Sequence, residues 1–330
     1  MSSKATSASA LPSQSATALR SPEPLRGRQS AAQPKVANVT EHGAPREGWA
    51  AWTKRAALAI AFDVKPPRHR AAPRLVARLL RHVLAGAEVR RVLPSPDDAL
   101  PGREGVAGYC DDLSVASLRR AYARGLFPCT HFGPMRWNAP PLRAVLDIRE
   151  FKLRDELRRK LKKRAFRVTF DAEPRAVMLA CAAPRPGQWP LTWISPAIVE
   201  AYMALNAAGD MHSVEVWDES GALVGGLFGT VVGRCFVVES LFHVRDHTSK
   251  YGLAVLIAHL QAWGFTHVDN KLQNPHTEAL GFREIARADY VALLAVPTPV
   301  ALARRRWSFD AGLDLGKWKP EQGGPVRMPR

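Results

Sequence analysis

Two acidic residues stand where a carboxylate is unfavourable unless it is paired or used in a reaction. Glu239 lies inside the apolar run VVESLF, and Asp269 follows the run GFTHV and precedes a polar cluster. That cluster includes Lys271, Gln273 and Asn274. Burying an unpaired charge is strongly unfavourable, so each acid is expected to be hydrogen-bonded or functional. From the residues alone, a hydrogen-bonded structural acid is the more frequent explanation.

The elements that must position these acids follow from apolar periodicity and turn residues. Strands are expected at the end of the stretch 125–147, on both sides of Gly233 within 222–242, and at residues 166–170, 212–218, 268–272 and 290–295. Helices are expected at residues 115–124, 176–182, 195–209, 249–265 and 276–282. Ser114 and Ser195 are suitable N-caps, and Gly125 and Gly209 are suitable helix ends. This mixed order predicts an α/β or α+β fold.

The charge of the chain is unusual for its size. Its 330 residues include 47 Lys and Arg but 30 Asp and Glu, a formal net charge of +17, which predicts attraction to polyanions. A basic helix is expected from Pro73, with Arg78 among the arginines around it. One face of that helix carries Leu75, Leu79, Leu80 and Val83. The helix is interpreted either as facing phosphates or as a solubilising surface helix, and a membrane-surface helix is the third interpretation.

The four cysteines indicate reduced thiols in a cytoplasmic protein. None forms a CxxC pair, and the histidines show no zinc-binding spacing, so neither a metal nor another cofactor is expected. The apolar run AALAIAF at residues 56–62 is too short to span a bilayer, and the Ser/Ala-rich start lacks a secretory pattern.

Several motifs together resemble one enzyme family. TWI, HSVEVW, VGGLFG, ESLF and NPHTEALG occur in order in the second half, and DLSVASLRRAYARGLFP and RWNAPPLRAVL precede them. From about residue 105 to 295 the chain resembles the bacterial leucyl/phenylalanyl-tRNA–protein transferases. The resemblance implies a small N-terminal domain followed by a GNAT-like acyltransferase domain with a mixed sheet. It also implies transfer of Leu, Phe or Met from charged tRNA to a protein N-terminus, which marks that protein for degradation.

The resemblance assigns roles to individual residues. Asp269 matches the acid that organises the reacting centre, and Glu239 matches the carboxylate of the family's GES motif. Trp137 and Trp193 match aromatic residues where the terminal adenosine of the tRNA and the acceptor peptide meet. The family's apolar pocket for the transferred side chain falls on Leu227, Phe236, Leu256 and Leu260, for which ordinary core packing is the alternative.

Further assignments concern substrate and tRNA contacts. Ser240 and Asn274 are predicted to contact substrate, and Lys250 and Arg78 to contact tRNA phosphates. A surface lysine near a helix start is the more common explanation for Lys250. The protein is expected to act as a monomer on aminoacyl-tRNA and an acceptor protein.

The chain departs from the family pattern at the site itself. The family's DCQ is Asp269, Asn270 and Lys271 here, so an ammonium replaces an amide. If the strand continues, Gln273 shares the face of Lys271 and is predicted to substitute for the missing glutamine. The family's FPW ends in Cys129, and the GES glycine is Val238. These changes leave open which N-terminal residue is accepted.

The segments suggest five parts. We expect a disordered tail at 1–46, a basic extension at 47–92, the small domain at 93–165, the catalytic domain at 166–300 and a C-terminal tail at 301–330. Two rival functions remain: a GNAT-type acyl-CoA N-acyltransferase and a non-catalytic tRNA-binding relative. The first expects a glycine-rich pyrophosphate turn, where this chain has RDHTSKYG. The presence of both acids argues against the second, whereas the loss of the family glutamine argues for it.

Overall fold

The computed structural model describes residues 72–184, 191–298 and 305–322, together with residues 53–54, 56–59 and 61. All of these residues belong to one unit, residues 35–330. The predicted disordered tail at residues 1–46 lies outside the described residues.

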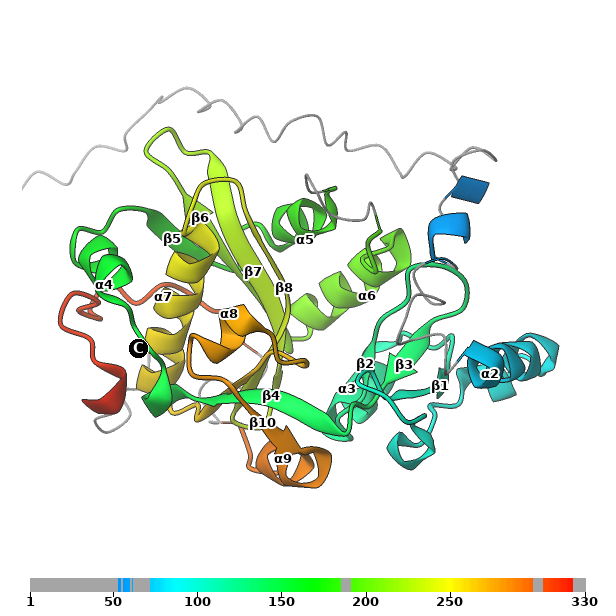
Figure 1. The fold of residues 1–330 in the computed structure, drawn as a ribbon. Helices are drawn as coiled ribbons and strands as arrows, with labels where there is room; N and C mark the ends of the chain where they lie inside the picture. The colour runs from blue at the N-terminus through cyan, green and yellow to red at the C-terminus, as the bar shows by residue number, and fades with distance from the viewer. Residues whose placement is uncertain are drawn as a thin grey trace, which may run out of the picture. The chain divides into compact units, whose positions relative to one another are not determined.

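A seven-stranded mixed sheet forms the centre of the fold, in the order β10-β4-β9-β8-β7-β6-β5 (Figure 1). β8 and β9 run parallel, and all other neighbours run antiparallel. The strands are β4 Leu142–Asp147, β5 Arg167–Phe170, β6 Met211–Trp217, β7 Leu223–Val232, β8 Cys235–His243, β9 His267–Asp269 and β10 Arg283–Ala286. The α/β fold class predicted from the sequence is confirmed.

Helices cover both faces of this sheet, and a separate apolar cluster lies on each face. α7 packs on one face, whereas α5 and α6 pack on the other (Figure 1). The α-helices are α2 Ala72–Leu84, α3 Val115–Ala123, α4 Asp155–Lys162, α5 Pro174–Ala182, α6 Pro196–Ala207, α7 Thr248–Ala262, α8 Pro275–Glu278 and α9 Arg287–Leu294. Short 3-10 helices occur at Val89–Arg91, Pro96–Asp98, Ile148–Glu150 and Pro320–Gln322.

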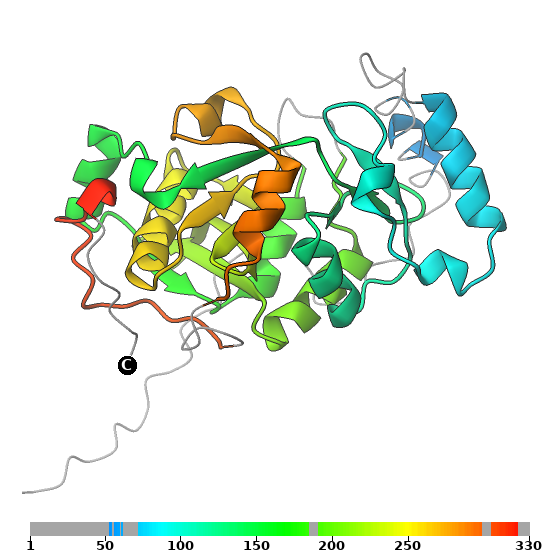
Figure 2. The ribbon, with the colours of Figure 1, turned by 90° about the horizontal axis from the view of Figure 1, so that it is seen from below.

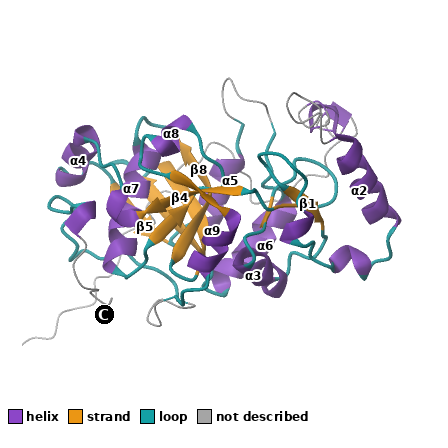
Figure 3. Cartoon of the chain, turned by 60° about the horizontal axis from the view of Figure 1, so that its bottom comes forward, coloured by secondary structure: helices purple, strands orange, loops and turns teal. Residues whose placement is uncertain are grey.

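A second, three-stranded sheet has the order β1-β3-β2. Its strands are β1 Val106–Tyr109, β2 Phe127–Pro128 and β3 Arg136–Asn138. It lies beside α3 and α6, with α2 beyond it (Figures 2 and 3). Trp137 of β3 belongs to the apolar cluster that also contains residues of α5 and α6, so the small sheet and the large sheet share one core.

The predicted helix caps are present. Ser114 Oγ accepts the Ser117 N–H at the start of α3, and Ser195 Oγ accepts the Ile198 N–H at the start of α6. Each cap satisfies one of the backbone donors that a helix start leaves unpaired. Gly125 follows α3 with a φ of 75°, a left-handed conformation in which glycine carries no Cβ penalty.

Two predicted elements differ from the structure, and one observed strand was not predicted. The predicted strand at residues 268–272 ends at Asp269. The predicted last strand at 290–295 is wrong, because α9 occupies this segment and buries Tyr290 and Leu294 four residues apart on one helical face. β10, which pairs with β4 at the sheet edge, was not predicted because its sequence REIA is short and half charged.

The predicted segment boundaries also differ from the observed packing. β4 precedes residue 165, the expected end of the small domain, yet it belongs to the large sheet. Within the predicted C-terminal tail, Trp307, Leu315 and Trp318 are buried in the cluster on the α7 face. Residues 305–322 are therefore part of the core. Among the described helices, none is long and apolar enough to cross a bilayer.

Candidate active site

A β-bulge places Glu239 outside the regular strand register. Phe228 of β7 pairs with Ser240 and Gly229 pairs with Val238, so Glu239 is the extra residue on β8. A bulge of this kind shifts the alternation of the residues that follow it, so that Leu241 packs against the α7 side and Phe242 against the α6 side. Glu239 follows Val237 by two residues, and Val237 belongs to the apolar cluster on the α5 and α6 face, so alternation along β8 turns the Glu239 carboxylate toward that face and toward Tyr122 of α3.

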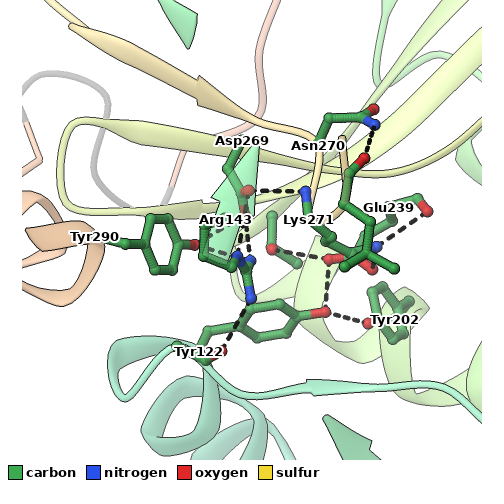
Figure 4. A network of polar contacts seen from close by, with 11 residues as sticks. Tyr122, Arg143, Tyr202, Glu239, Asp269, Asn270, Lys271 and Tyr290 are labelled. Atoms are coloured by element: carbon green, nitrogen blue, oxygen red, sulfur yellow. Dashed lines mark hydrogen bonds and ion pairs between the residues drawn. The ribbon is translucent and has the colours of Figure 1, made fainter. Parts of the chain in front are cut away.

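Three groups donate hydrogen bonds to the buried Glu239 carboxylate, whose side chain is 0% exposed (Figure 4). The Tyr122 hydroxyl donates to Oε1 at 2.6 Å, and the Thr230 hydroxyl donates to the same oxygen at 3.3 Å. Lys271 Nζ donates to Oε2 at 2.7 Å and to the Glu239 carbonyl at 3.1 Å. The Tyr202 hydroxyl contacts that of Tyr122 and extends the network into α6.

Asp269 controls the backbone conformation of Lys271. Its Oδ1 accepts the Lys271 backbone N–H at 2.8 Å, and Lys271 has a φ of 64°. A lysine seldom adopts this left-handed conformation, and an aspartate two residues earlier stabilises such a turn. The turn leads the Lys271 side chain back to Glu239, so the two acids contact one residue through different atoms (Figure 4).

Asp269 itself is fully enclosed by donors. The Arg143 guanidinium from β4 contacts both carboxylate oxygens, and the Tyr290 hydroxyl from α9 donates to Oδ2 at 2.9 Å. Arg143 also donates to the Gly125 carbonyl at 3.0 Å. Since the Arg143 and Asp269 side chains are 1% and 0% exposed, this ion pair is closed to solvent.

The surroundings fix the protonation states of the neighbouring groups. Burial, with the nearby Glu239 charge, raises the pKa of Tyr122 well above its usual value, and burial likewise raises the pKa of Tyr290. Both hydroxyls therefore remain donors at neutral pH. Burial alone would lower the pKa of Arg143, but the Asp269 carboxylate raises it above its ordinary value, so the guanidinium stays charged.

Aromatic rings flank the Lys271 ammonium. Nζ lies 5.3 Å from the centre of the Phe127 ring and 5.4 Å from that of Trp193. The Lys271 side chain is 12% exposed, whereas the Glu239 side chain is 0% exposed. Lys271 is therefore the member of the Glu239 ion pair that a substrate can reach.

The structure places Gln273 and Asn274 away from both carboxylates. Gln273 donates to the Phe282 carbonyl at 2.9 Å, because the chain turns after Asp269 instead of continuing as a strand. The exposed Asn274 caps α8 through the backbone N–H groups of His276 and Thr277. The prediction that Gln273 shares the Lys271 face depended on a strand that has already ended.

The two predicted site tryptophans differ in accessibility. Trp137 is 0% exposed, and its indole donates to the Cys110 carbonyl at 3.0 Å. Trp193 is half-buried beside Lys271, so its ring lies at the candidate site. Ser240 is also half-buried and pairs with Phe228 on the Glu239 side of the sheet.

The four predicted pocket residues are not brought together with Glu239. Leu227, Phe236, Leu256 and Leu260 are each 0% exposed. They belong to the cluster between the sheet and α7, whereas Glu239 faces the cluster on the opposite side. Alternation along β8 explains the difference for Phe236, since Phe236 and Glu239 are three residues apart and therefore point to opposite faces. All four residues pack in this core, and their role as a substrate pocket stays a prediction.

The two residues predicted to contact tRNA phosphates, Lys250 and Arg78, differ in their surroundings. Exposed Lys250 lines a pocket of about 110 Å³ at the start of α7. Basic side chains dominate that pocket, namely Lys152, Arg154, Lys160, His247, Lys250 and His276, with Glu156 as their acidic neighbour. Arg78 instead donates to the backbone carbonyls of Val106 and Ala107 at 2.8 and 2.6 Å. Arg78 thus attaches α2 to β1.

Several residues of the site were not predicted from the sequence. Arg143, Tyr122, Tyr202, Tyr290 and Phe127 complete the network, but each stands singly in an ordinary segment. A buried arginine inside the apolar strand LRAVLD was the available signal, because an unpaired guanidinium is unfavourable there. Within the described residues, no group of three or more His, Cys, Asp and Glu side chains could hold a metal ion.

Comparison with known proteins identifies the class of the chain and then its family. The family model described as leucyl/phenylalanyl-tRNA protein transferase matches residues 145–295. The chain is 38% identical over 224 residues to the leucyl/phenylalanyl-tRNA–protein transferase of Methylococcus capsulatus, covering 68% of this chain and 94% of that one. It is 40% identical over 226 residues to that of Aromatoleum aromaticum, with coverages of 68% and 94%. The chain is therefore an aminoacyltransferase. It belongs to the leucyl/phenylalanyl-tRNA–protein transferase family.

Among solved structures, a functionally unknown conserved protein from Staphylococcus epidermidis aligns with a TM-score of 0.31 and 10% identity. The alignment covers 55% of this chain and 68% of that chain. This likeness is too distant to support an argument, and the GNAT-like description stays a prediction.

Proposed function

We propose that this chain transfers Leu, Phe or Met from charged tRNA to the N-terminal amine of an acceptor protein, and so marks that protein for degradation. The observation that carries the proposal is the Lys271 ammonium, held by Glu239 and positioned by Asp269, in a chain of this family. We keep the predicted division into a small N-terminal domain and a catalytic domain. β4 then belongs to the seven-stranded sheet of the catalytic domain.

The reaction needs alignment and charge stabilisation more than a strong base. An aminoacyl ester is already activated, and the α-amine of a peptide titrates near pH 8, about one unit above neutrality. The neutral amine attacks the ester carbonyl, the C–O bond to the ribose breaks, and the amine's proton ends on the departing ribose oxygen. Holding the reactants in line can contribute roughly 7–11 kcal/mol.

Lys271 is the group proposed to touch the reacting atoms. Glu239 accepts two of its N–H donors, which leaves one of the three for the carbonyl oxygen that becomes negative. Glu239 keeps the ammonium in place. Asp269 is a positioning residue, because Arg143, Tyr290 and the Lys271 backbone N–H already occupy its oxygens.

The basic pocket around Lys250 is proposed to contact tRNA phosphates. Its Lys and Arg side chains lie at the start of the 15-residue helix α7, whose dipole also favours anions. Trp193 beside Lys271 offers an aromatic face to the terminal adenosine. We retain Ser240 as a proposed substrate contact on the Glu239 side of the sheet.

Incubation of the purified protein with labelled Leu-, Phe- and Met-tRNA and a panel of N-terminal peptides tests the function. Labelled peptide is expected, and it should disappear when the tRNA is deacylated beforehand. Absence of labelled peptide across the whole panel would refute the proposal. Acetyl transfer from acetyl-CoA in parallel tubes would instead support the rival acyltransferase.

A further inference from the structure

The side chains around Lys271 Nζ form a binding site for a cation. Glu239 supplies its carboxylate at 2.7 Å and its carbonyl at 3.1 Å, and the rings of Phe127 and Trp193 are centred 5.3 and 5.4 Å away. Carboxylate, carbonyl and aromatic faces all attract positive charge. We refer to Glu239, Phe127 and Trp193 as the cation cage.

The chain fills this cage with its own lysine. The Asp269 contact and the φ of 64° hold the Lys271 backbone where the side chain reaches Glu239. The Lys271 ammonium therefore neutralises the Glu239 carboxylate on the side of the site that a substrate can reach. Asp269 provides no alternative negative charge, because Arg143 pairs with it.

The other nearby charges do not restore an anionic site. Arg136 is buried and lies 3.6 Å from Glu104, so that pair is close to neutral. A positive side chain that approached the cage would meet the Lys271 ammonium in a site of low polarity. Like charges at such a contact are strongly unfavourable.

We propose that Lys271 is the internal occupant of the cation cage and excludes acceptors whose N-terminal residue is basic. The accepted substrates are then proteins with neutral or acidic N-terminal side chains, because the positive charge of Lys271 repels neither of them. This inference rests on the proposed function for its substrate. The cage itself is a property of the described residues and is testable without catalysis.

Acceptor selectivity provides the first test. Wild-type protein should use peptides beginning with Arg or Lys at least about tenfold less efficiently in kcat/KM than peptides beginning with Ala or Asp, a factor that corresponds to roughly 1.4 kcal/mol. Lys271→Gln should move the ratio toward basic peptides by at least the same factor, and Lys271→Arg should not. A wild-type preference for basic peptides, or an unchanged ratio in Lys271→Gln, overturns the proposal.

Chemical rescue provides a test that needs no turnover. In Lys271→Ala, n-butylammonium should bind the vacated cage and raise the Tm in a saturable manner, whereas n-butanol should not. Lys163→Ala, which removes an exposed lysine of the α4 end, is the matched control and should respond to neither. Equal responses to the alcohol and the ammonium, or no response to either, would refute the cage.

The two tests separate the inference from the proposed function. If no peptide is labelled by any variant but butylammonium still stabilises Lys271→Ala, the transferase proposal fails and the cage stands. If basic peptides are labelled best by the wild type, the transferase proposal stands and the exclusion by Lys271 fails.

Discussion

The Asp269 carboxylate accepts the backbone N–H of Lys271 at 2.8 Å, and the Lys271 ammonium donates to Glu239 at 2.7 Å. One residue therefore links two buried acids that the chain separates by a helix. β8 and β9 are parallel neighbours, with Val237 opposite Asp269, and this pairing brings the acids to the same end of the sheet. The acids differ in role because Asp269 shapes the backbone and Glu239 holds the charge.

Removing Asp269 should disrupt both the fold and the site. Asp269→Ala leaves the buried Arg143 guanidinium without its counter-ion, which typically destabilises a protein by about 3–5 kcal/mol. Transfer activity should be nearly abolished, since the Lys271 turn loses its acceptor. Urea unfolding and initial rates with charged tRNA measure the two effects.

A double variant separates stability from positioning. Arg143→Met combined with Asp269→Leu replaces the pair by apolar side chains and should recover most of the lost stability. Activity should remain absent, because no carboxylate then accepts the Lys271 N–H. Restored activity in the double variant would show that Asp269 matters only as the partner of Arg143.

Leu256 and Leu260 should behave as core residues of α7. Either change to alanine should lower the free energy of unfolding by about 2–5 kcal/mol, the range for buried leucines. The relative use of Leu-, Phe- and Met-tRNA in a competition assay should stay unchanged, because both side chains lie on the face opposite Glu239. A shift in that preference without loss of stability would assign them to the substrate pocket after all.

The sequence predicted the long elements well because their signals are local. The caps at Ser114 and Ser195 and the apolar run of α7 depend on neighbouring residues alone. The site depends on features that the sequence does not display. The bulge at Glu239 exists only relative to β7, and the pairing of Arg143 with Asp269 joins residues 126 positions apart.

The sequence also does not show which face of the large sheet carries the site. Alternation along a strand indicates that Leu227 and Phe228 point to opposite sides, but it does not tell which side carries the chemistry. That choice follows from Tyr122 and Thr230, which reach Glu239 from α3 and β7. The family resemblance identified the two acids, whereas their hydrogen-bonding partners could be identified only from the tertiary structure.

The two tryptophans should respond differently to replacement by phenylalanine. Trp137→Phe leaves the buried Cys110 carbonyl without its donor and should lower stability by about 1–3 kcal/mol. Trp193→Phe should change KM for charged tRNA or the acceptor with a smaller effect on stability, since Trp193 is half-buried beside Lys271. Thermal unfolding and steady-state kinetics distinguish them. Equal kinetic effects with intact stability would argue against the burial of Trp137 in the working enzyme.

The contribution of Lys250 should depend on salt. Lys250→Glu should raise KM for charged tRNA and reduce the salt slope of binding by about one unit, as expected for the loss of one phosphate contact. KM for an aminoacyl-adenosine, which lacks the upstream phosphates, should not change. Similar effects on both substrates would place Lys250 outside the tRNA contact surface.

His259 should make stability depend on pH. Its ring is buried in α7, where Nδ1 contacts the Val255 carbonyl at 2.7 Å and Nε2 accepts the Asp310 N–H at 3.2 Å. Burial lowers the pKa of His259 to about 4, so the folded protein keeps the ring neutral while the unfolded chain protonates it near pH 6.5. Since the unfolded state then binds more protons, stability should fall as the pH drops from about 6.5 to about 4 and should level off below that.

The His259 contribution can be isolated with a neutral replacement. An ordinary pKa of 6.5 and a folded value of about 4 give a difference whose upper limit is roughly 3 kcal/mol over that interval. His259→Gln can keep a donor for Val255 and an acceptor for Asp310 while it removes the titration. Urea unfolding at pH 7.5, 6.0 and 4.5 should show a smaller decline for His259→Gln than for the wild type. Parallel pH profiles for the two proteins would show that His259 does not carry the effect.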